Sequence, residues 1–341
     1  MLEFLKIDGG FGEGGGQIVR TAITLSCITK TPIIIENIRK NRKNPGLKPQ
    51  HLTAIKILQK ICDANVEGAE TGSTNLKFIP NTIKDANLDE DVKTAGSISL
   101  ILQVLILVSA ICNKKLELAI KGGTDVSWSP TIDYTKYVLR EAYTRLGINF
   151  SLELVKRGYY PRGGGKINLK VFPAKIKAIS LIKRKTRKLK IFCSYSKLSE
   201  NIVKEKVEKI KSKLIEEEFD VQVIICNQEA IDSGSSILIT SIDEESIIGI
   251  DSIFDKKANE FNLDLKQITG NYLGVDQNLA DMLVVPASVA KGMTIFRVPK
   301  ISKHLETNLF VTSKITGCKY GVGKLPDGFE IRIEGISNPS V

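Results

Sequence analysis

The sequence predicts an α/β (α+β) protein in which three repeated two-layer α/β units form a large domain that carries a smaller inserted α/β domain. Two observations support this fold class. One pattern of helices and strands occurs three times along the chain, and a longer interval with a pattern of its own interrupts the third copy. With 341 residues and 42% hydrophobic content, the chain is long enough for more than one hydrophobic core.

The repeated pattern has the same four parts in each copy. A turn of small residues leads into an apolar helix, and a short strand follows it. A loop then leads into a second helix, and the copy closes with a glycine-rich turn and a strand of alternating hydrophobic residues. We expect the first helices at residues 14–28, 95–112 and 286–291, the strands after them at 32–38, 115–121 and 294–298, and the second helices from Pro49, Pro130 and Ile301.

The spacing of the copies locates the insertion. His51 and Ile132 are 81 residues apart, whereas Ile132 and His304 are 172 residues apart. We therefore expect an inserted domain at residues 184–270 and a large catalytic domain made of residues 1–183 and 271–341. Four apolar residues of the insertion fall on one helical face: Val203, Val207, Ile210 and Leu214. Strands are expected around them at 189–194, 221–226, 236–241 and 247–250.

Bulk properties narrow the class of protein. A formal net charge of +11 favours polyanionic partners such as nucleic acids or nucleotides. The six cysteines are widely spaced, which is typical of buried, reduced thiols and not of zinc ligands or a disulfide framework. The chain starts without a signal-peptide pattern, and the most apolar run, residues 98–112, is too short to cross a bilayer. We expect a cytoplasmic protein without membrane spans.

The segment that leads into the insertion is strongly basic. Residues 175–190 read KIKAISLIKRKTRKLK. Two interpretations are open for this run of charge: it contacts an RNA backbone, or it is a solvated linker.

The two histidines of the chain occupy corresponding places in the first and third copies. His51 and His304 both fall in the first turn of a second helix. Helix N-termini present unpaired N–H groups and favour anions, and the same positive field lowers the basicity of an imidazole. Each histidine is either a neutral nucleophile beside phosphates or a residue that caps and packs locally.

The glycine-rich loop at residues 7–20 also has two interpretations. Gly10, Gly12 and Gly15, with Glu36 after the next strand, match a dinucleotide-binding fingerprint. The chain does not continue as alternating parallel strands and helices, so the repeat explains the pattern better. Within the loop, Glu13 either binds a divalent cation that bridges to phosphates or caps the amides of its own turn.

A basic loop follows the first strand of the repeat. Arg39 and Arg42 lie three residues apart in RKNRKNPGLKPQH, where prolines limit flexibility. Arginines on a rigid loop can grip a phosphate in bidentate fashion, and Arg20 is placed to join them. The alternative is a simple basic surface loop.

Several motifs in this order resemble those of the RNA 3'-terminal phosphate cyclases: EGGGQIVR, IRKNRKNPGLKPQHL, EGAETGS, TAGS, KGGTD, RGYYPRGGG, LADMLVVP and KHLETN. The resemblance implies an ATP-dependent enzyme that uses Mg2+ or Mn2+ and converts an RNA 3'-phosphate into a 2',3'-cyclic phosphodiester. It implies RNA and not DNA as the main substrate, a covalent histidine–AMP intermediate, and three repeated units with an inserted domain. An oligomer is possible.

The resemblance also assigns roles to ten residues. His304 is similar to the adenylated nucleophile and Glu13 to the metal ligand, and four residues resemble groups that hold the triphosphate or the RNA phosphate: Arg20, Arg39, Arg42 and Gln50. Gln103, Pro130, Asn278 and Asp281 correspond to the nucleotide pocket, with Asn278 in place of a tyrosine that packs on adenine in bacterial members. Met282 stands in place of a glutamine, and Lys303 in place of a small residue.

Two alternatives belong to other classes of protein. The same fold occurs in non-catalytic RNA-binding factors of ribosome assembly, which lack the nucleophilic histidine. Enolpyruvyl transferases have a similar repeated architecture, but the histidine-centred motifs do not fit them.

Overall fold

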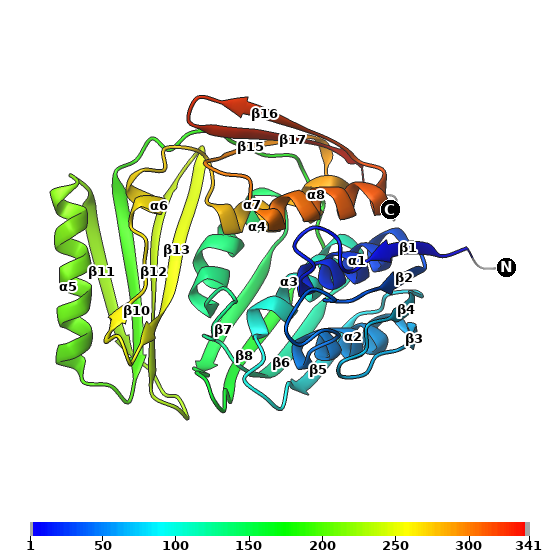
Figure 1. The fold of residues 1–341 in the computed structure, drawn as a ribbon, viewed down its shortest axis with the longest axis horizontal. Coiled ribbons are helices and arrows are strands. Elements are labelled where there is room, and N and C mark those ends of the chain that lie inside the picture. The colour runs from blue at the N-terminus through cyan, green and yellow to red at the C-terminus, as the bar shows by residue number, and fades with distance from the viewer. Residues whose placement is uncertain (1–2, 338–341) are drawn as a thin grey trace.

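The computed structural model describes residues 3–337 and contains three α/β units of the same design (Figure 1). The first unit consists of β1 (Leu5–Asp8), α1 (Gly16–Thr29), β2 (Ile33–Glu36), α2 (Pro49–Cys62), β3 (Asn65–Glu67) and β4 (Leu76–Ile79). The second consists of β5 (Ala86–Asp91), α3 (Ile98–Ile111), β6 (Leu116–Gly122), the π-helix η1 (Tyr134–Leu139), α4 (Arg140–Arg145), β7 (Phe150–Lys156) and β8 (Gly165–Val171). The third consists of β9 (Ser180–Leu181), α7 (Gln277–Val289), β15 (Lys291–Val298), α8 (Lys303–Thr316), β16 (Lys319–Leu325) and β17 (Gly328–Ile336).

The three sheets have one topology. Their strand orders are β1-β2-β4-β3, β5-β6-β8-β7 and β9-β15-β17-β16. In each sheet the first pair is parallel and the other two pairs are antiparallel. The first helix of each unit connects the parallel pair, as a parallel pair requires. The sequence pattern therefore identified the repeat, and the α/β class is confirmed.

Residues between β9 and α7 form a separate five-stranded sheet. Its elements are β10 (Lys188–Ser196), α5 (Glu200–Glu216), β11 (Asp220–Asn227), β12 (Gly234–Asp243), β13 (Ser246–Asp255), β14 (Glu260–Phe261) and α6 (Lys266–Thr269), with the strand order β11-β10-β12-β13-β14. Helix α5 buries Val203, Val207 and Leu214 against this sheet, as its helical spacing predicts. The sheet has a hydrophobic core of its own and lies beside the second unit in Figure 1.

Some predicted element bounds were wrong. The first helix of the third unit, expected at 286–291, is α7, which begins at Gln277 because the Asp276 carboxylate accepts hydrogen bonds from the Asn278 and Leu279 amides. Pro286 lies inside this helix and not at its start. The strands β3, β5, β7, β9 and β16 were not predicted; several are short or exposed and so lack a strong apolar alternation.

Helix α3 forms the centre of the molecule. Twelve of its fourteen residues are buried, which confirms the prediction of a buried core helix at 98–112. The two that are not buried, Leu100 and Gln103, face the cavities described below. Across residues 3–337, none of the helices is both long and apolar enough to span a membrane.

The basic segment before the insertion makes contacts with the inserted domain. The Arg184 guanidinium donates to the Ile268 carbonyl at 2.6 Å, and Arg187 donates to the Glu218 carbonyl at 3.0 Å. Lys185 forms an ion pair with Glu245. These contacts favour the interpretation of this segment as a linker over its interpretation as a segment that contacts an RNA backbone.

All six cysteines are free thiols. Four of them are buried, as predicted, but Cys226 is exposed and Cys112 is only partly buried. Cys226 lies near the end of β11, an edge strand of the inserted sheet that pairs with another strand on one side only.

A buried arginine connects the second unit to the inserted sheet. Arg157 follows β7 and is 1% exposed. Its guanidinium donates to both oxygens of Asp125 at 2.9 Å and to Asp133 at 2.6 Å. It also donates to the side chains of Ser194, Gln228 and Ser236 in the inserted domain. Burial opposes charge on Arg157, but the two aspartates outweigh burial and raise its pKa above the ordinary value.

Candidate active site

Two adjoining cavities open where the three units meet. The apolar cavity, of about 350 Å³, has walls from Leu100, Val104, Leu107, Pro130 and Val285. The basic cavity, of about 880 Å³, has Arg39, Arg42 and Lys48 in its wall. Six residues line both cavities: Gln17, Arg20, Leu100, Trp128, Ser129 and His304. Together the cavities suit a ligand with one apolar part and one strongly anionic part.

All ten residues selected from the sequence line these cavities. Arg20 and His304 lie at the junction. Four line the basic cavity only: Glu13, Arg39, Arg42 and Gln50. Another four line the apolar cavity only: Gln103, Pro130, Asn278 and Asp281. The residues come from α1, α2, α3, α7 and α8 and from the loops beside them, so each of the three units contributes a wall.

His304 is the second residue of α8, after the cap residue Ser302. The Ser302 hydroxyl accepts a hydrogen bond from the Leu305 amide at 2.9 Å and fixes the start of the helix. His304 Nδ1 lies 2.6 Å from the Gln17 amide oxygen and 3.3 Å from a Glu13 carboxylate oxygen. Both neighbours are acceptors, so Nδ1 carries the proton. The lone pair of the neutral ring is then on Nε2.

The surroundings of His304 favour the neutral imidazole. Burial lowers the pKa of His304, and the cations Arg20 and Arg42 lower it further. The nearby Glu13 carboxylate acts in the opposite direction, but Arg42 forms an ion pair with Glu13 and offsets its charge. A neutral imidazole with a free Nε2 is the form that can attack an electrophile.

His51 has a different environment. Its side chain is buried, and its Nδ1 accepts a hydrogen bond from the Lys48 amide at 3.1 Å. Burial and the neighbouring cations Arg20, Arg39 and Lys48 lower the pKa of His51 to about 3. The ring packs against Gly16, where a Cβ atom would lie 2.2 Å from His51 Nε2. His51 therefore caps and packs locally.

The two histidines should be distinguishable by NMR titration. We expect the Cε1–H resonance of His304 to titrate with a midpoint below 6.5 and that of His51 not to titrate above pH ~4. Arg42→Gln should raise the His304 midpoint, because it removes a cation and leaves Glu13 without its partner. A wild-type His304 midpoint at or above 6.5 would contradict this description of the site.

The glycine-rich loop places Glu13 beside His304. Gly12 has φ 57°, and a Cβ atom there would lie 2.2 Å from the Thr307 hydroxyl oxygen of α8. The Glu13 amide donates to the same hydroxyl at 3.3 Å. The loop packs this closely on α8 only because position 12 has no side chain. Within the described residues, the Glu13 carboxylate contacts Arg42 and His304 and makes no side-chain hydrogen bond to its own turn.

The arginines of the basic cavity are held differently from one another. Arg39 has φ 55°, and its Nη1 donates to the carbonyls of Asn44 and Gly46 at 2.8 and 3.0 Å, so part of its guanidinium closes its own loop. Arg42 pairs with Glu13. Burial lowers the pKa of Arg20 to about 10, and Asp281 opposes this shift. Arg20 therefore remains a cation at neutral pH.

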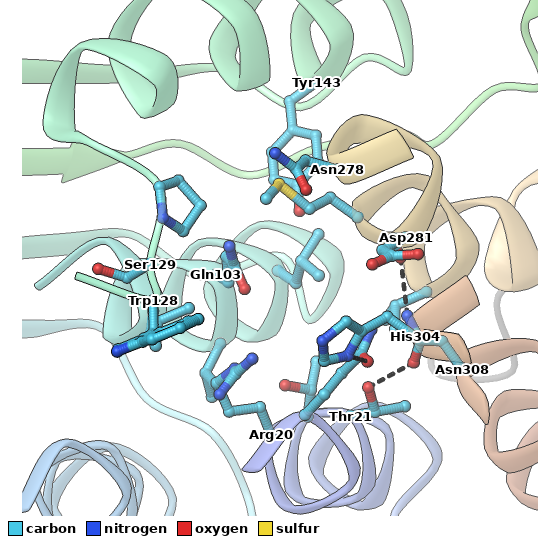
Figure 2. A pocket seen from close by; sticks show the side chains of 18 of the residues that line it. Arg20, Thr21, Gln103, Trp128, Ser129, Tyr143, Asn278, Asp281, His304 and Asn308 are labelled. Carbon is cyan, nitrogen blue, oxygen red and sulfur yellow. Dashed lines mark hydrogen bonds between the residues drawn. The ribbon is translucent and has the colours of Figure 1, made fainter. Parts of the chain in front are cut away.

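Polar groups in the apolar cavity supply both donors and acceptors. Burial raises the pKa of Asp281 to about 7, although Ser302 donates a hydrogen bond to this carboxylate at 3.0 Å. Asn308 donates to the Asp281 carbonyl at 2.7 Å and accepts from the Thr21 hydroxyl at 2.6 Å (Figure 2), and these bonds tie α8 to α7 and α1. Asp251, from the inserted sheet, also reaches this cavity.

Five residues of the site were not predicted: Gln17, Ser302, Asn308, Asp251 and Trp128. One sequence signal could have identified the first. Gln17, Arg20, Thr21 and Thr24 form a polar stripe at helical spacing on a helix whose other positions are almost all apolar. Asp251 comes from the inserted domain, and its approach to the cavity depends on how the two domains pack.

Comparisons with known proteins give one family. A family model described as "RNA 3'-terminal phosphate cyclase" matches residues 11–322. The RNA 3'-terminal phosphate cyclase of Methanococcoides burtonii is 37% identical over 332 residues, which cover 97% of this chain and 100% of that protein. The protein of the same name from Saccharolobus islandicus is 41% identical over 344 residues, covering 96% and 99%. Among solved structures, the enolpyruvyl transferase NikO from Streptomyces tendae matches at 10% identity with a TM-score of 0.44, covering 99% of this chain and 49% of that one.

Proposed function

Because the chain belongs to the RNA 3'-terminal phosphate cyclase family, we propose that it uses ATP to convert an RNA 3'-phosphate into a 2',3'-cyclic phosphodiester. One observation carries this proposal. The His304 imidazole has a free Nε2 and a lowered pKa, and it lies where an apolar cavity meets a basic one. A nucleoside triphosphate placed across the junction would bring its α-phosphorus to His304.

In the first step, His304 Nε2 attacks the α-phosphorus of ATP, and pyrophosphate leaves. The protein then carries AMP on a phosphoramidate bond. Gln17 and Glu13 hold Nδ1–H and stabilise the positive charge that develops on the ring during the attack. The guanidinium groups of Arg20 and Arg42 stabilise the charge on the phosphates that react and leave.

Two transfers then complete the reaction. An oxygen of the RNA 3'-phosphate attacks the AMP phosphorus, the bond to Nε2 breaks, and RNA-adenylate forms. The neighbouring 2'-hydroxyl next attacks the 3'-phosphorus, and AMP leaves as the ring closes. This division uses covalent catalysis to replace one difficult condensation by three displacements at phosphorus.

The cavities fit the two parts of ATP. The adenosine part suits the apolar walls, with Gln103, Asn278 and Asp281 as polar partners. The triphosphate part suits Arg20, Arg39, Arg42, Lys48 and Gln50. Because Asn278 presents no aromatic ring to the base, the apolar contacts would come instead from Pro130, Tyr143, Met282 and the aliphatic side chains of α3 and α7.

A divalent cation also fits the site. No group of three or more His, Cys, Asp or Glu side chains within residues 3–337 is arranged to hold a metal ion alone. Mg2+ and Mn2+ commonly bind one carboxylate together with substrate phosphates, and Glu13 is the carboxylate that borders the basic cavity. When bound, the cation neutralises phosphate charge. Glu13 would hold it, and Arg42 would turn from Glu13 to the phosphates.

Incubation with ATP and a 3'-phosphorylated RNA oligonucleotide tests the proposal. We expect a product with a 2',3'-cyclic phosphate. It should form only with Mg2+ or Mn2+, and its formation should stop when EDTA is added. The matched control is the same RNA with a 2'-deoxy terminal nucleotide, which lacks the last nucleophile and should stop at RNA-adenylate. The need for this 2'-hydroxyl is also the reason that we propose RNA, and not DNA, as the main substrate.

The alternative is a non-catalytic RNA-binding assembly factor of the same fold. It predicts that RNA binds but that neither a protein–AMP adduct nor a cyclic end forms with either metal ion. The location of the protein stays a prediction. We expect it in the cytoplasm, because the proposed reaction needs cellular ATP and RNA.

A further inference from the structure

The single tryptophan of the chain occupies an unusual position. Trp128 is 100% exposed, and its backbone lies in the left-handed region with φ 66°. A bulky residue at positive φ is a conformational outlier, and such strain is concentrated at ligand sites and active sites. A fully exposed indole buries no apolar surface in the fold, and a positive φ costs free energy. Both features therefore point to a ligand.

The loop that carries Trp128 is fixed on both sides. Before it, the buried Arg157 binds Asp125 at 2.9 Å. After it, the Ser129 hydroxyl donates to the Val126 carbonyl at 2.9 Å, and the Thr131 amide donates to Asp251 at 2.7 Å. The indole is therefore presented by a braced loop, and its exposure is a built feature of the site.

Trp128 lies at the opening between the two cavities. It lines both of them, on the side opposite His304 and Asp281 in Figure 2. A second exposed aromatic residue, Tyr160, is 74% exposed and lines the basic cavity. Its loop is also held, because the Arg162 amide and guanidinium both donate to Asp232 at 2.9 Å. Two aromatic rings thus border a cavity that contains Arg39, Arg42 and Lys48.

Exposed aromatic rings beside arginines are the usual means of binding single-stranded RNA, in which bases stack on the rings and cations hold the phosphates. We infer that Trp128, assisted by Tyr160, stacks on the unpaired terminal base of the RNA while the 3'-phosphate lies in the basic cavity. Every base has a π-face, so the site accepts any terminal base. This inference rests on the proposed function, since it specifies how that substrate is held.

The position of the indole favours RNA over the base of ATP as its partner. The apolar cavity already has walls from α3 and α7 for a nucleoside. Trp128 is fully exposed to solvent and so offers its face to a chain that arrives from outside. Tyr160 lines the basic cavity only and has no place beside a base in the apolar one.

Intrinsic fluorescence tests the inference directly, because all tryptophan emission comes from Trp128. Wild-type protein is titrated, without ATP, with a short 3'-phosphorylated RNA and with the same RNA carrying an abasic last nucleotide. We expect the emission to change strongly with the first RNA and only weakly with the second at saturation. Equal changes with both RNAs, or a change with ATP alone to which RNA adds nothing, would overturn the inference.

Variants measure the strength of the contact through the affinity for fluorescently labelled RNA. Trp128→Ala should raise the Kd of the intact RNA about 10-fold and leave the Kd of the abasic RNA unchanged, and Trp128→Phe should restore most of the affinity. Tyr160→Ala should have a smaller effect in the same direction. An unchanged Kd in Trp128→Ala would contradict the inference. Failure of the proposed function would appear separately, as a wild-type protein that binds RNA but forms neither an AMP adduct nor a cyclic end.

Discussion

His304→Ala is expected to abolish the covalent protein–AMP adduct and to lower the cyclisation rate by a factor on the order of 10⁴ or more, the scale of losing a covalent nucleophile. The reason is specific to the site. Of the two imidazoles in the chain, only His304 has its Nε2 at the junction of the cavities, with Nδ1 held by Gln17 at 2.6 Å. The measurement is incubation with ATP labelled at the α-phosphate, followed by denaturing electrophoresis. The adduct should be acid-labile and base-stable, as a phosphoramidate is.

His51→Ala is the matched control, because it removes the only other imidazole. His51 is buried with Nδ1 bonded to the Lys48 amide, so we expect this variant to retain the adduct. Circular dichroism should show both variants folded. If folded His304→Ala still carries the label, or if only folded His51→Ala loses it, then His304 is not the nucleophile and another residue must be.

Arg157→Ala should destabilise the fold by about 3–5 kcal/mol, the usual cost of removing one partner from a buried ion pair. The change leaves the Asp125 and Asp133 carboxylates buried without their shared cation. It also removes the donors to Ser194 and Ser236 that connect the second unit to the inserted sheet. Denaturant-induced unfolding measures the effect as a loss in the free energy of unfolding.

The pH dependence separates this explanation from simple loss of packing. Burial already raises the pKa of Asp133 with Arg157 present, and loss of the cation should raise it further. The folded variant then binds more protons than the unfolded chain, so the stability deficit should shrink as pH falls toward 5. Arg162→Ala is the control: its side chain is 65% exposed, its ion pair with Asp232 is at the surface, and it should cost no more than about 1 kcal/mol. A deficit in Arg157→Ala that stays constant with pH would exclude unpaired carboxylates as its cause.

The repeat was predictable because local patterns of apolar and small residues mark its helices, strands and turns. Apolar periodicity identified α3 and α5, and the unequal spacing of the copies located the separate sheet at β10–β14. The start of α7 was wrong because the small residues around Pro286 resemble a helix start, whereas the real cap is Asp276, ten residues earlier. The short strand β9 has only two residues and no sequence signal of its own.

The site was predictable as a set of residues but not as a set of contacts. The helical position of His304 was visible in the sequence, and so was its equivalence to His51. The residue pattern left their roles equal, and only the family resemblance selected His304. The physical difference between them is tertiary: Lys48 occupies one ring nitrogen of His51, while Gln17, 287 positions away in the chain, orients His304. The pairing of Arg42 with Glu13 and the braced exposure of Trp128 likewise depend on how loops from different units pack.

The late pairing of β9 affects the order in which the protein can form. In the first two units the parallel strands pair over short intervals, with Leu5 opposite Ile33 and Ala86 opposite Leu116. In the third, Ser180 pairs with Ile295, 115 residues later. Pairings of such high contact order form slowly, and chains fold from the N-terminus as they are synthesised. The first two units can therefore fold before β15 has been synthesised to pair with β9. His304 follows β15, so it is among the last residues to join the two cavities. If the proposed mechanism holds, an incomplete chain lacks the nucleophile that reacts with ATP.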